Sequence, residues 1–296
     1  MTLLWIALIP AAVTAAWIRY RSVVDDASSD TPDGYTLTQP HPAAPWGSHG
    51  HQQGAQWLHE VFERSARRYP DLCALSVPES GEVLTYAELE RRANRMAAAI
   101  GRYVDSAEQV VAVSLPQDTA LPVILHLAIL KAGAAQCFID AEAPDEHVQR
   151  VIADAQPALF ITDQSHTNIT CPVVSSEAWQ IKTEKSTLNE ARPTWLRQPA
   201  TQLASIFYTS GTTGTPKGVE CPHAGYINLA QSYATFYDFV PGSDATSLTS
   251  SLGYDGSISE MYSAWVAGCE VVLLSKSALR SGPELLPGLR DAQATA

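Results

Sequence analysis

The residues best suited to chemistry lie close together in one loop, from Tyr208 to Gly218, which reads YTSGTTGTPKG. Its glycines let the backbone approach a ligand closely, its hydroxyl side chains add hydrogen-bond donors, and Lys217 adds a positive charge. An apolar strand is expected directly before it, at Ala204 to Phe207, so the loop lies at the carboxyl end of a strand, where open α/β sheets usually bind ligands. This combination predicts a loop that holds a polyphosphate.

The loop is not a Walker A motif. That motif needs a glycine, four intervening residues and then Gly-Lys, whereas the residue at that point after Gly211 is Pro216. The order of residues therefore argues against a P-loop NTPase or a kinase. An ordinary loop rich in serine, threonine and glycine is the alternative, and the fixed order of glycines, proline and lysine disfavours it.

The string from Tyr208 to Val219 closely resembles the phosphate-binding signature of the adenylate-forming (AMP-binding) enzymes, which include the adenylation domains of nonribosomal peptide synthetases, acyl-CoA ligases and luciferases. Two further segments are similar to family motifs: Leu84 to Leu89 (LTYAEL), and Leu130 to Asp140 (LKAGAAQCFID), in which Gln136-Cys137-Phe138 stands where the family usually has Tyr-Val-Pro. The resemblance extends from about Trp57 to Leu274.

In the resembled family, a carboxylic acid attacks the α-phosphorus of Mg²⁺-bound ATP to give an acyl-adenylate and pyrophosphate, which requires positioned donors and cations around the phosphates. The resemblance assigns the contacts with ATP to the residues of the loop. A phosphopantetheine carrier would enter only through a partner domain. The residues carried over as ATP-binding are Thr209, Ser210, Gly211, Thr212, Thr213, Gly214 and Lys217.

A second segment, Gly253 to Tyr262, resembles the family's F-D-x-S-x-x-E motif, with Tyr254 in place of the phenylalanine. In amino-acid-activating members, the aspartate of this motif pairs with the α-ammonium group of the substrate, a contact that a fatty-acid pocket does not need. Asp255 is thus the expected substrate-binding residue. The alternative is that Asp255 caps the following helix, and one residue can do both.

These motifs need a scaffold, and apolar periodicity predicts one. Strands alternate with helices, which indicates βαβ units and an α/β fold with mostly parallel sheets flanked by helices. Together with the resemblance, this predicts an incomplete N-terminal subdomain of an adenylate-forming enzyme.

Two capping boxes are expected, Thr85 with Glu88 and Ser257 with Glu260. A polar stretch, 180–201, is expected to separate two blocks. The expected strands are Val110 to Leu115, Gln136 to Ile139, Ala158 to Thr162, Leu203 to Tyr208, Thr246 to Ser251 and Cys269 to Leu274; the expected helices are Leu58 to Tyr69, a second one opened by Thr85, Leu121 to Ala132, Asp145 to Ala155, Gly225 to Tyr237 and Ser257 to Ala267; Ser275 to Ala296 is expected to be a loop and tail.

The chain divides into three expected regions: an apolar segment at 1–24, a linker at 25–54, and at 55–296 the truncated N-terminal part of an AMP-binding adenylation domain. Leu3 to Ile18 is nearly continuously apolar and is followed by Arg19 and Arg21, so residues 3–18 are a candidate membrane anchor that leaves the rest cytoplasmic. The run is slightly shorter than the roughly 20 residues of a typical span. A non-native start of the chain is the alternative.

The net charge and the spacing of the cysteines limit which partners, metals and compartments are expected. The formal net charge of −12 supplies no basic field for a nucleic acid, so no polynucleotide partner is expected. The cysteines lie far apart without a C-x-x-C pair, and we expect them to be buried small hydrophobic residues in a reducing compartment and no metal site.

Several family segments are absent from the 296 residues: the N-x-Y-G-P-T-E and Y-x-T-G-D motifs, and the small lobe whose lysine contacts the reacting carboxylate. We therefore expect an amino-acid-adenylating sequence that shows little activity as this polypeptide alone. Two alternatives are a non-catalytic protein or interaction module that keeps the fold, and an acyl-CoA-ligase-like enzyme, which Asp255 disfavours. The sequence does not specify which amino acid would be bound.

Overall fold

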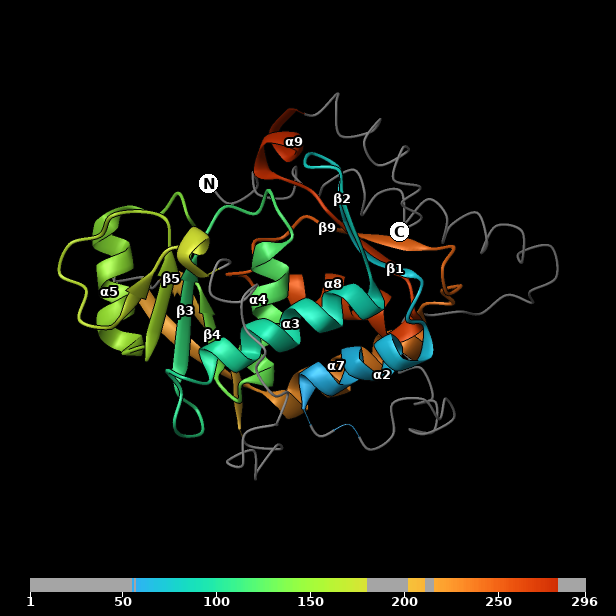
Figure 1. Ribbon diagram of the computed structural model, residues 1–296, viewed down its shortest axis with the longest axis horizontal. Helices are drawn as coiled ribbons and strands as arrows, with labels where there is room; N and C mark the ends of the chain where they lie inside the picture. Colours follow the sequence, from blue (N-terminus) through green and yellow to red (C-terminus); the bar gives the residue numbers. More distant parts are fainter. Residues whose placement is uncertain (1–54, 56, 180–201, 211–215, 282–296) are drawn as a thin grey trace, which may run out of the picture. The chain divides into compact units, whose positions relative to one another are not determined.

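A computed structural model describes residue 55 and residues 57–179, 202–210 and 216–281 (Figure 1). The expected apolar segment at 1–24, the linker at 25–54 and the polar connection at 180–201 lie outside these residues. Within the described ranges, no helix has both the length and the apolar character that a membrane span requires.

A four-stranded sheet brings together strands from the two ends of the described chain, in the order β2-β1-β10-β9. β1 pairs parallel with β10, and β10 pairs parallel with β9, while β2 runs antiparallel to β1. We did not predict β1 or β2 from the sequence. The strands are β1 (Cys73–Val77), β2 (Glu82–Thr85), β9 (Ala245–Leu248) and β10 (Glu270–Leu273).

A six-stranded sheet has the order β6-β5-β3-β4-β7-β8. Its strands are parallel except for the last pair, in which β8 runs antiparallel to β7. β8 was not predicted, because we expected the loop after Tyr208 to lead directly into a helix. The strands are β3 (Val110–Ser114), β4 (Ala135–Phe138), β5 (Leu159–Thr162), β6 (Val173–Val174), β7 (Leu203–Ser210) and β8 (Pro216–Pro222).

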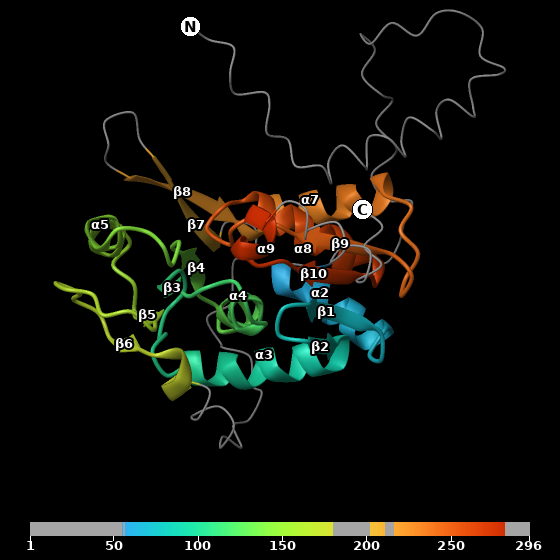
Figure 2. The same ribbon diagram turned by 90° about the horizontal axis from the view of Figure 1, so that it is seen from above.

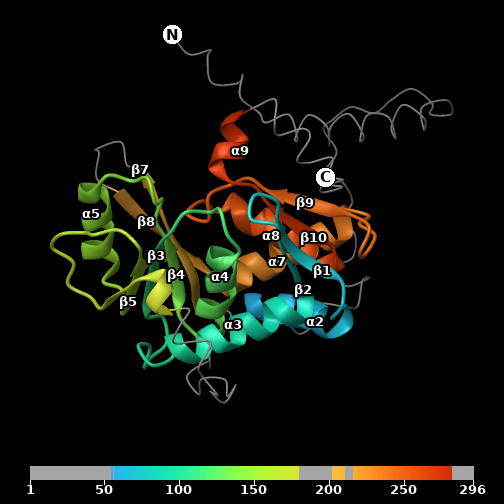
Figure 3. The same ribbon diagram turned by 45° about the horizontal axis from the view of Figure 1, so that its top comes forward.

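The two sheets exchange segments of the chain, so the prediction of two separate sequence blocks was wrong. β7 and β8 follow the 180–201 stretch yet join the earlier strands, and β1 pairs with β10, almost two hundred residues later in the sequence. Helices between the sheets contact one another and form a central layer (Figure 3). They are α2 (Leu58–Arg68), α3 (Tyr86–Ile100), α4 (Leu121–Lys131), α7 (His223–Phe236) and α8 (Gly256–Ala267).

Helix α5 (Asp145–Ala155) covers the other face of the six-stranded sheet (Figure 2). This explains why β3 is apolar throughout: Val111 and Val113 belong to the core cluster of the central layer, whereas Val110 and Ala112 pack in a second cluster with Val148 of α5. A parallel strand covered on both faces is expected to be continuously apolar.

The first predicted capping box is confirmed. Thr85 Oγ1 accepts the backbone N–H of Glu88 at 3.2 Å, and the Glu88 carboxylate accepts the N–H of Thr85 at 3.0 Å, so α3 begins where the sequence indicated. The second one was wrong. Ser257 Oγ donates to the carbonyl of Tyr254, and the Glu260 carboxylate binds residues upstream of the helix.

Two smaller expectations need correction. The segment after Leu274 was expected to be a loop, but Lys276–Ser281 forms a short helix, α9. All five cysteines are free thiols, and Cys137 and Cys269 are buried as expected, whereas Cys73, Cys171 and Cys221 are partly exposed. Burial raises the pKa of Cys137 to about 12.

Candidate active site

The expected phosphate-binding residues lie on a hairpin formed by β7 and β8. Thr209 and Lys217 are direct partners across the two strands, and both are exposed. Ser210 pairs with Pro216 at the end of the hairpin. Gly211, Thr212, Thr213 and Gly214 lie outside the described residues. Thr209 and Lys217 therefore lie side by side, open to a ligand.

The hairpin is anchored to the six-stranded sheet and to α5. The Tyr208 hydroxyl, one residue before Thr209, donates to the Asp154 carboxylate at 2.7 Å. Burial and this contact raise the pKa of Tyr208 well above its ordinary value, so the phenol stays a neutral donor. The hairpin is thereby held next to Thr209, while the Thr209 and Lys217 side chains face solvent.

Asp255 occupies the N-cap position of α8, but its side chain makes no capping hydrogen bond. The residue is exposed, and its backbone is helical (φ −62°, ψ −25°) rather than extended, as a side-chain cap normally requires. Its carboxylate thus stands at the positive end of a helix dipole. The capping alternative considered from the sequence has no hydrogen bond to support it.

Tyr226 of α7 connects Asp255 with the hairpin electrostatically. The pKa of this phenol is raised well above its ordinary value, chiefly by burial, then by Cys221 of β8, and also by the Asp255 carboxylate. Helix α7 contacts both α8, which begins directly after Asp255, and β8 of the hairpin. One helix therefore joins the elements that carry the two candidate sites.

The segment that leads into Asp255 is clamped by Glu260, one turn into α8. The Glu260 carboxylate accepts the backbone N–H groups of Thr249 and Ser250 at 2.9 and 3.0 Å, and also their hydroxyl groups at 3.0 and 2.8 Å. Hydrogen bonds to an ionised acceptor are among the strong ones. The carboxylate therefore folds the segment back onto its own helix.

A second clamp holds the same segment from the six-stranded sheet. The Gln117 side-chain amide donates to the Ser250 carbonyl at 3.2 Å and accepts the Leu252 N–H at 2.8 Å. Gly253 also packs so closely that a Cβ atom there would lie 2.8 Å from the Phe138 carbonyl oxygen. Only glycine fits at this contact, and it joins the Asp255 segment to the end of β4.

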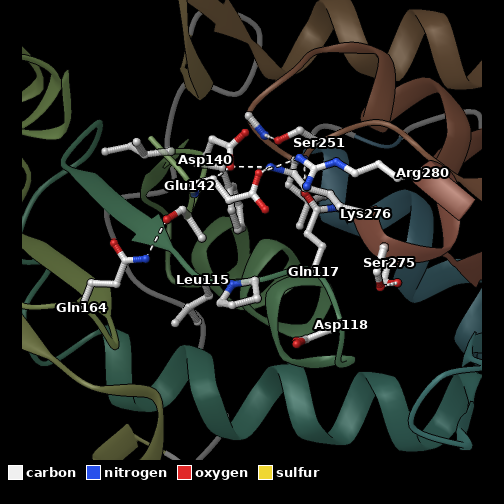
Figure 4. Close-up of a pocket in the computed structure, with 17 residues that line it drawn as sticks. Leu115, Gln117, Asp118, Asp140, Glu142, Gln164, Ser251, Ser275, Lys276 and Arg280 are labelled. Carbon is white, nitrogen blue, oxygen red and sulfur yellow. Dashed lines mark hydrogen bonds and ion pairs between the residues drawn. The ribbon is translucent and has the colours of Figure 1, made fainter. Parts of the chain in front are cut away.

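A cavity of about 300 Å³ lies at the carboxyl ends of several strands, beside this clamped segment (Figure 4). Gln117, Gly253 and Asp140 line it, whereas Thr209, Lys217 and Asp255 do not. Lys276 of α9 donates to Asp140 across the cavity. Burial raises the pKa of Asp140, but this hydrogen bond and the nearby cations outweigh burial and leave the pKa below its usual value.

The charges of this cavity decide which ligand group it suits. Arg280 donates to Glu142 at 2.8 Å, so both basic side chains of the lining are already paired with carboxylates, and Asp118 adds a further negative charge. The cavity therefore offers no surplus positive charge for a triphosphate. Among the described residues, Lys217 on the hairpin remains the better candidate for phosphate. No cluster of three or more potential metal ligands occurs in the described part of the chain.

Gln117 and Lys276 are site-forming residues that were not predicted from the sequence, and the role of Glu260 was predicted incorrectly. Gln117 and Lys276 each follow the last residues of an apolar strand, and a search for polar residues at the carboxyl ends of all expected strands would have found both. Glu260 was noticed, but it was assigned to a local cap instead of a clamp on residues ten positions earlier.

A family model described as AMP-binding enzyme matches residues 62–296. The chain belongs to the AMP-binding enzyme family. Its relatives include peptide synthases: the chain is 33% identical over 224 residues to tyrocidine synthase 1 from Brevibacillus parabrevis, and 33% identical over 235 residues to the dimodular nonribosomal peptide synthase from Bacillus subtilis (strain 168). These matches cover 75% and 76% of the chain, but only 20% and 10% of the two relatives.

Solved structures with low sequence identity share the fold. The N-terminal subdomain of NpsA from Klebsiella oxytoca matches 81% of the chain with a TM-score of 0.67 and 21% identity, over 60% of that structure. VinN, in a complex with L-aspartate, matches 81% of the chain with a TM-score of 0.69 and 22% identity, over 65% of that structure. The expected fold class is confirmed: an α/β arrangement of mostly parallel sheets flanked by helices, like the N-terminal subdomain of an adenylation domain.

Proposed function

We propose that this chain provides the ATP-binding and amino-acid-binding part of a peptide-synthetase-type adenylation domain, at residues 55–296. The substrates are Mg·ATP and an amino acid, and the aminoacyl group would pass to the phosphopantetheine arm of a carrier domain. Because the reaction consumes ATP, the cytoplasm is the proposed location. The chain spans a small part of its curated relatives, so this function concerns the adenylation step alone.

The observation that carries the proposal is the exposed Thr209–Lys217 pair at the end of the hairpin. A hydroxyl and an ammonium group on adjacent strands face solvent, next to a sequence that resembles the family's phosphate-binding signature. A lysine ammonium binds phosphate as a compact point charge, and donors that are fixed before the reaction need no reorganisation when charge develops. The hairpin therefore suits the β- and γ-phosphates of ATP.

Asp255 supports an amino acid as the second substrate. Its exposed carboxylate makes no helix cap, and an α-ammonium group would supply the missing partner. The substrate carboxylate would then attack the α-phosphorus, the bond between the α- and β-phosphates would break, and Mg-pyrophosphate would leave. We expect these 296 residues to bind substrate but to exchange pyrophosphate slowly, because they contain no N-x-Y-G-P-T-E segment and no small-lobe lysine.

Replacing Lys217 with methionine is expected to weaken Mg·ATP binding by about ten- to a hundredfold, since a charge-assisted contact contributes roughly 1.5–3 kcal/mol. Titration calorimetry measures this change. Arg95→Met is the matched control, because it also removes one exposed positive charge, from α3, far from the hairpin in the sequence. Equal affinities of the two variants for Mg·ATP would contradict a phosphate site at Lys217.

Replacing Asp255 with asparagine is expected to abolish the discrimination between amino acids and their desamino analogues, because the neutral amide no longer pairs with an ammonium group. The measurement is the ligand-induced rise in melting temperature with Mg·ATP and a panel of L-amino acids, each compared with its desamino acid. Retained discrimination in Asp255→Asn would exclude the proposed role. A wild-type chain that prefers desamino acids would instead favour an acyl-CoA-ligase-like enzyme.

A further inference from the structure

A chain of buried polar side chains crosses the core between the two candidate sites. The Tyr262 hydroxyl lies 3.0 Å from His126 Nε2, His126 Nδ1 lies 2.6 Å from Gln136 Oε1, and Gln136 Nε2 donates to Ser205 Oγ at 2.9 Å. The four residues are at most 1% exposed. Buried polar groups are costly unless each is paired, and here every link is made by a side chain of this set.

The direction of the hydrogen bonds is fixed by chemistry. Gln136 Oε1 can only accept, so His126 Nδ1 carries the proton, and His126 Nε2 must accept from the Tyr262 hydroxyl. Burial lowers the pKa of His126 to about 4, which keeps the imidazole neutral with one donor and one acceptor nitrogen. With Gln136 Oε1 facing His126, each donor faces the next acceptor, in the order Tyr262, His126, Gln136 and Ser205.

The hydrogen-bonded side chains join the elements that carry the phosphate hairpin and Asp255. Tyr262 lies on α8, which begins directly after Asp255, and Ser205 lies on β7, which ends at Thr209 and Ser210. Between them, His126 of α4 and Gln136 of β4 complete the path; α4 lies between β4 and α8 in both views (Figures 2 and 3). Gln136 and Ser205 are also direct partners in the sheet.

Gln136 is a buried amide in a strand whose neighbours Ala135 and Cys137 are buried apolar residues. A fully satisfied buried polar network rigidifies the elements that it joins, because breaking a link leaves a buried polar group without its partner. The network thus has the property needed to fix one element relative to another.

We propose that Tyr262, His126, Gln136 and Ser205 form a positioning network that holds the strand entering the phosphate hairpin in register with the helix that starts at Asp255. This rests on the function proposed above. The residues touch neither substrate, so they act through β7 and α8. Loss of one link is expected to loosen β7 and to weaken Mg·ATP binding from a distance.

Tyr262→Phe tests the proposal, with Tyr86→Phe as a matched control. Both tyrosines are buried, and each loses one hydroxyl with one hydrogen bond, since the Tyr86 hydroxyl donates to the Cys269 carbonyl at 2.7 Å. We expect similar losses in melting temperature, but only Tyr262→Phe should weaken Mg·ATP binding, by about three- to tenfold. Equal dissociation constants in the two variants would overturn the positioning role.

Amide hydrogen exchange of Leu203–Ser210 separates this proposal from the proposed function, because it needs no ligand. Exchange in β7 should be faster in Tyr262→Phe than in Tyr86→Phe. If the wild-type chain shows no saturable Mg·ATP binding, the adenylation proposal fails, and the exchange data alone still decide whether the network holds β7. Equal exchange in the two variants would refute the network.

Discussion

Lys131→Met is expected to destabilise the fold by about 3–5 kcal/mol, the usual result of removing one partner from a buried ion pair. Lys131 is only 7% exposed as a residue, and its Nζ lies 2.7 Å from a carboxylate oxygen of Glu63 and 2.7 Å from one of Glu90. Glu63 is equally buried, and its other cation, Arg67, lies farther away, at 3.8 Å. The lysine joins α2, α3 and α4, and denaturant unfolding measures its loss.

A neutral version of the same cluster provides the control. If the penalty arises from unpaired charge, Lys131→Met combined with Glu63→Gln and Glu90→Gln should recover most of the lost stability, because no buried charge then remains. A triple variant that is as unstable as the single one would assign the effect to lost packing of the lysine chain. If the free energy of unfolding of Lys131→Met is within about 1 kcal/mol of the wild-type value, the ion pairs of Lys131 contribute little to stability, as exposed ion pairs do.

Local structure could be predicted well from the sequence where the spacing of apolar residues followed one clear periodicity. The helix at Asp145–Ala155 was predicted with both boundaries correct, since an acidic first turn and apolar residues such as Val148 and Ile152 identify it within a few turns of chain. The capping box at Thr85 and Glu88 was equally local. Both features depend on contacts between neighbours in the sequence, and these are the contacts a single sequence encodes directly.

The errors arise where long-range pairing decides the outcome. β8 is mostly exposed and contains Lys217 and Glu220, so no apolar pattern distinguishes it from a loop; it is a strand because β7 pairs with it. β1 pairs with β10 from the opposite end of the described chain, which no local pattern indicates. The assignment of strands to two sheets follows from such pairings and could not be inferred from element order.

The candidate site also combines features that are local in the sequence with contacts that are distant in it. The motif around Gly214 and Lys217 and the aspartate at 255 could be located by residue type and order alone. Their arrangement could not, because it depends on Gln117 holding a segment 133 positions away and on Gly253 packing against Phe138. Sequence therefore indicated which groups could react, and the fold adds which residues hold them.

Glu260 illustrates this most clearly, and its removal gives a large expected effect. Glu260→Ala deletes the acceptor of the hydrogen bonds from Thr249 and Ser250, leaving two backbone N–H groups to find water in a partly buried place. Hydrogen bonds to a charged acceptor contribute roughly 1.5–3 kcal/mol each and do not add fully, so a loss of about 2–4 kcal/mol is expected. Denaturant unfolding measures it.

Glu260→Gln distinguishes a positioning clamp from a requirement for charge. Glutamine keeps one carbonyl oxygen for the backbone N–H groups of Thr249 and Ser250, and its amide can donate to their hydroxyl oxygens, which rotate to accept. We therefore expect Glu260→Gln to lose less than about 1 kcal/mol and to keep its thermal-shift preference for amino acids over desamino acids, while Glu260→Ala loses that preference although Asp255 is intact. Should Glu260→Ala bind as wild type does, the segment before Asp255 would be held by Gln117 and Gly253 alone, and Glu260 would serve only the stability of α8.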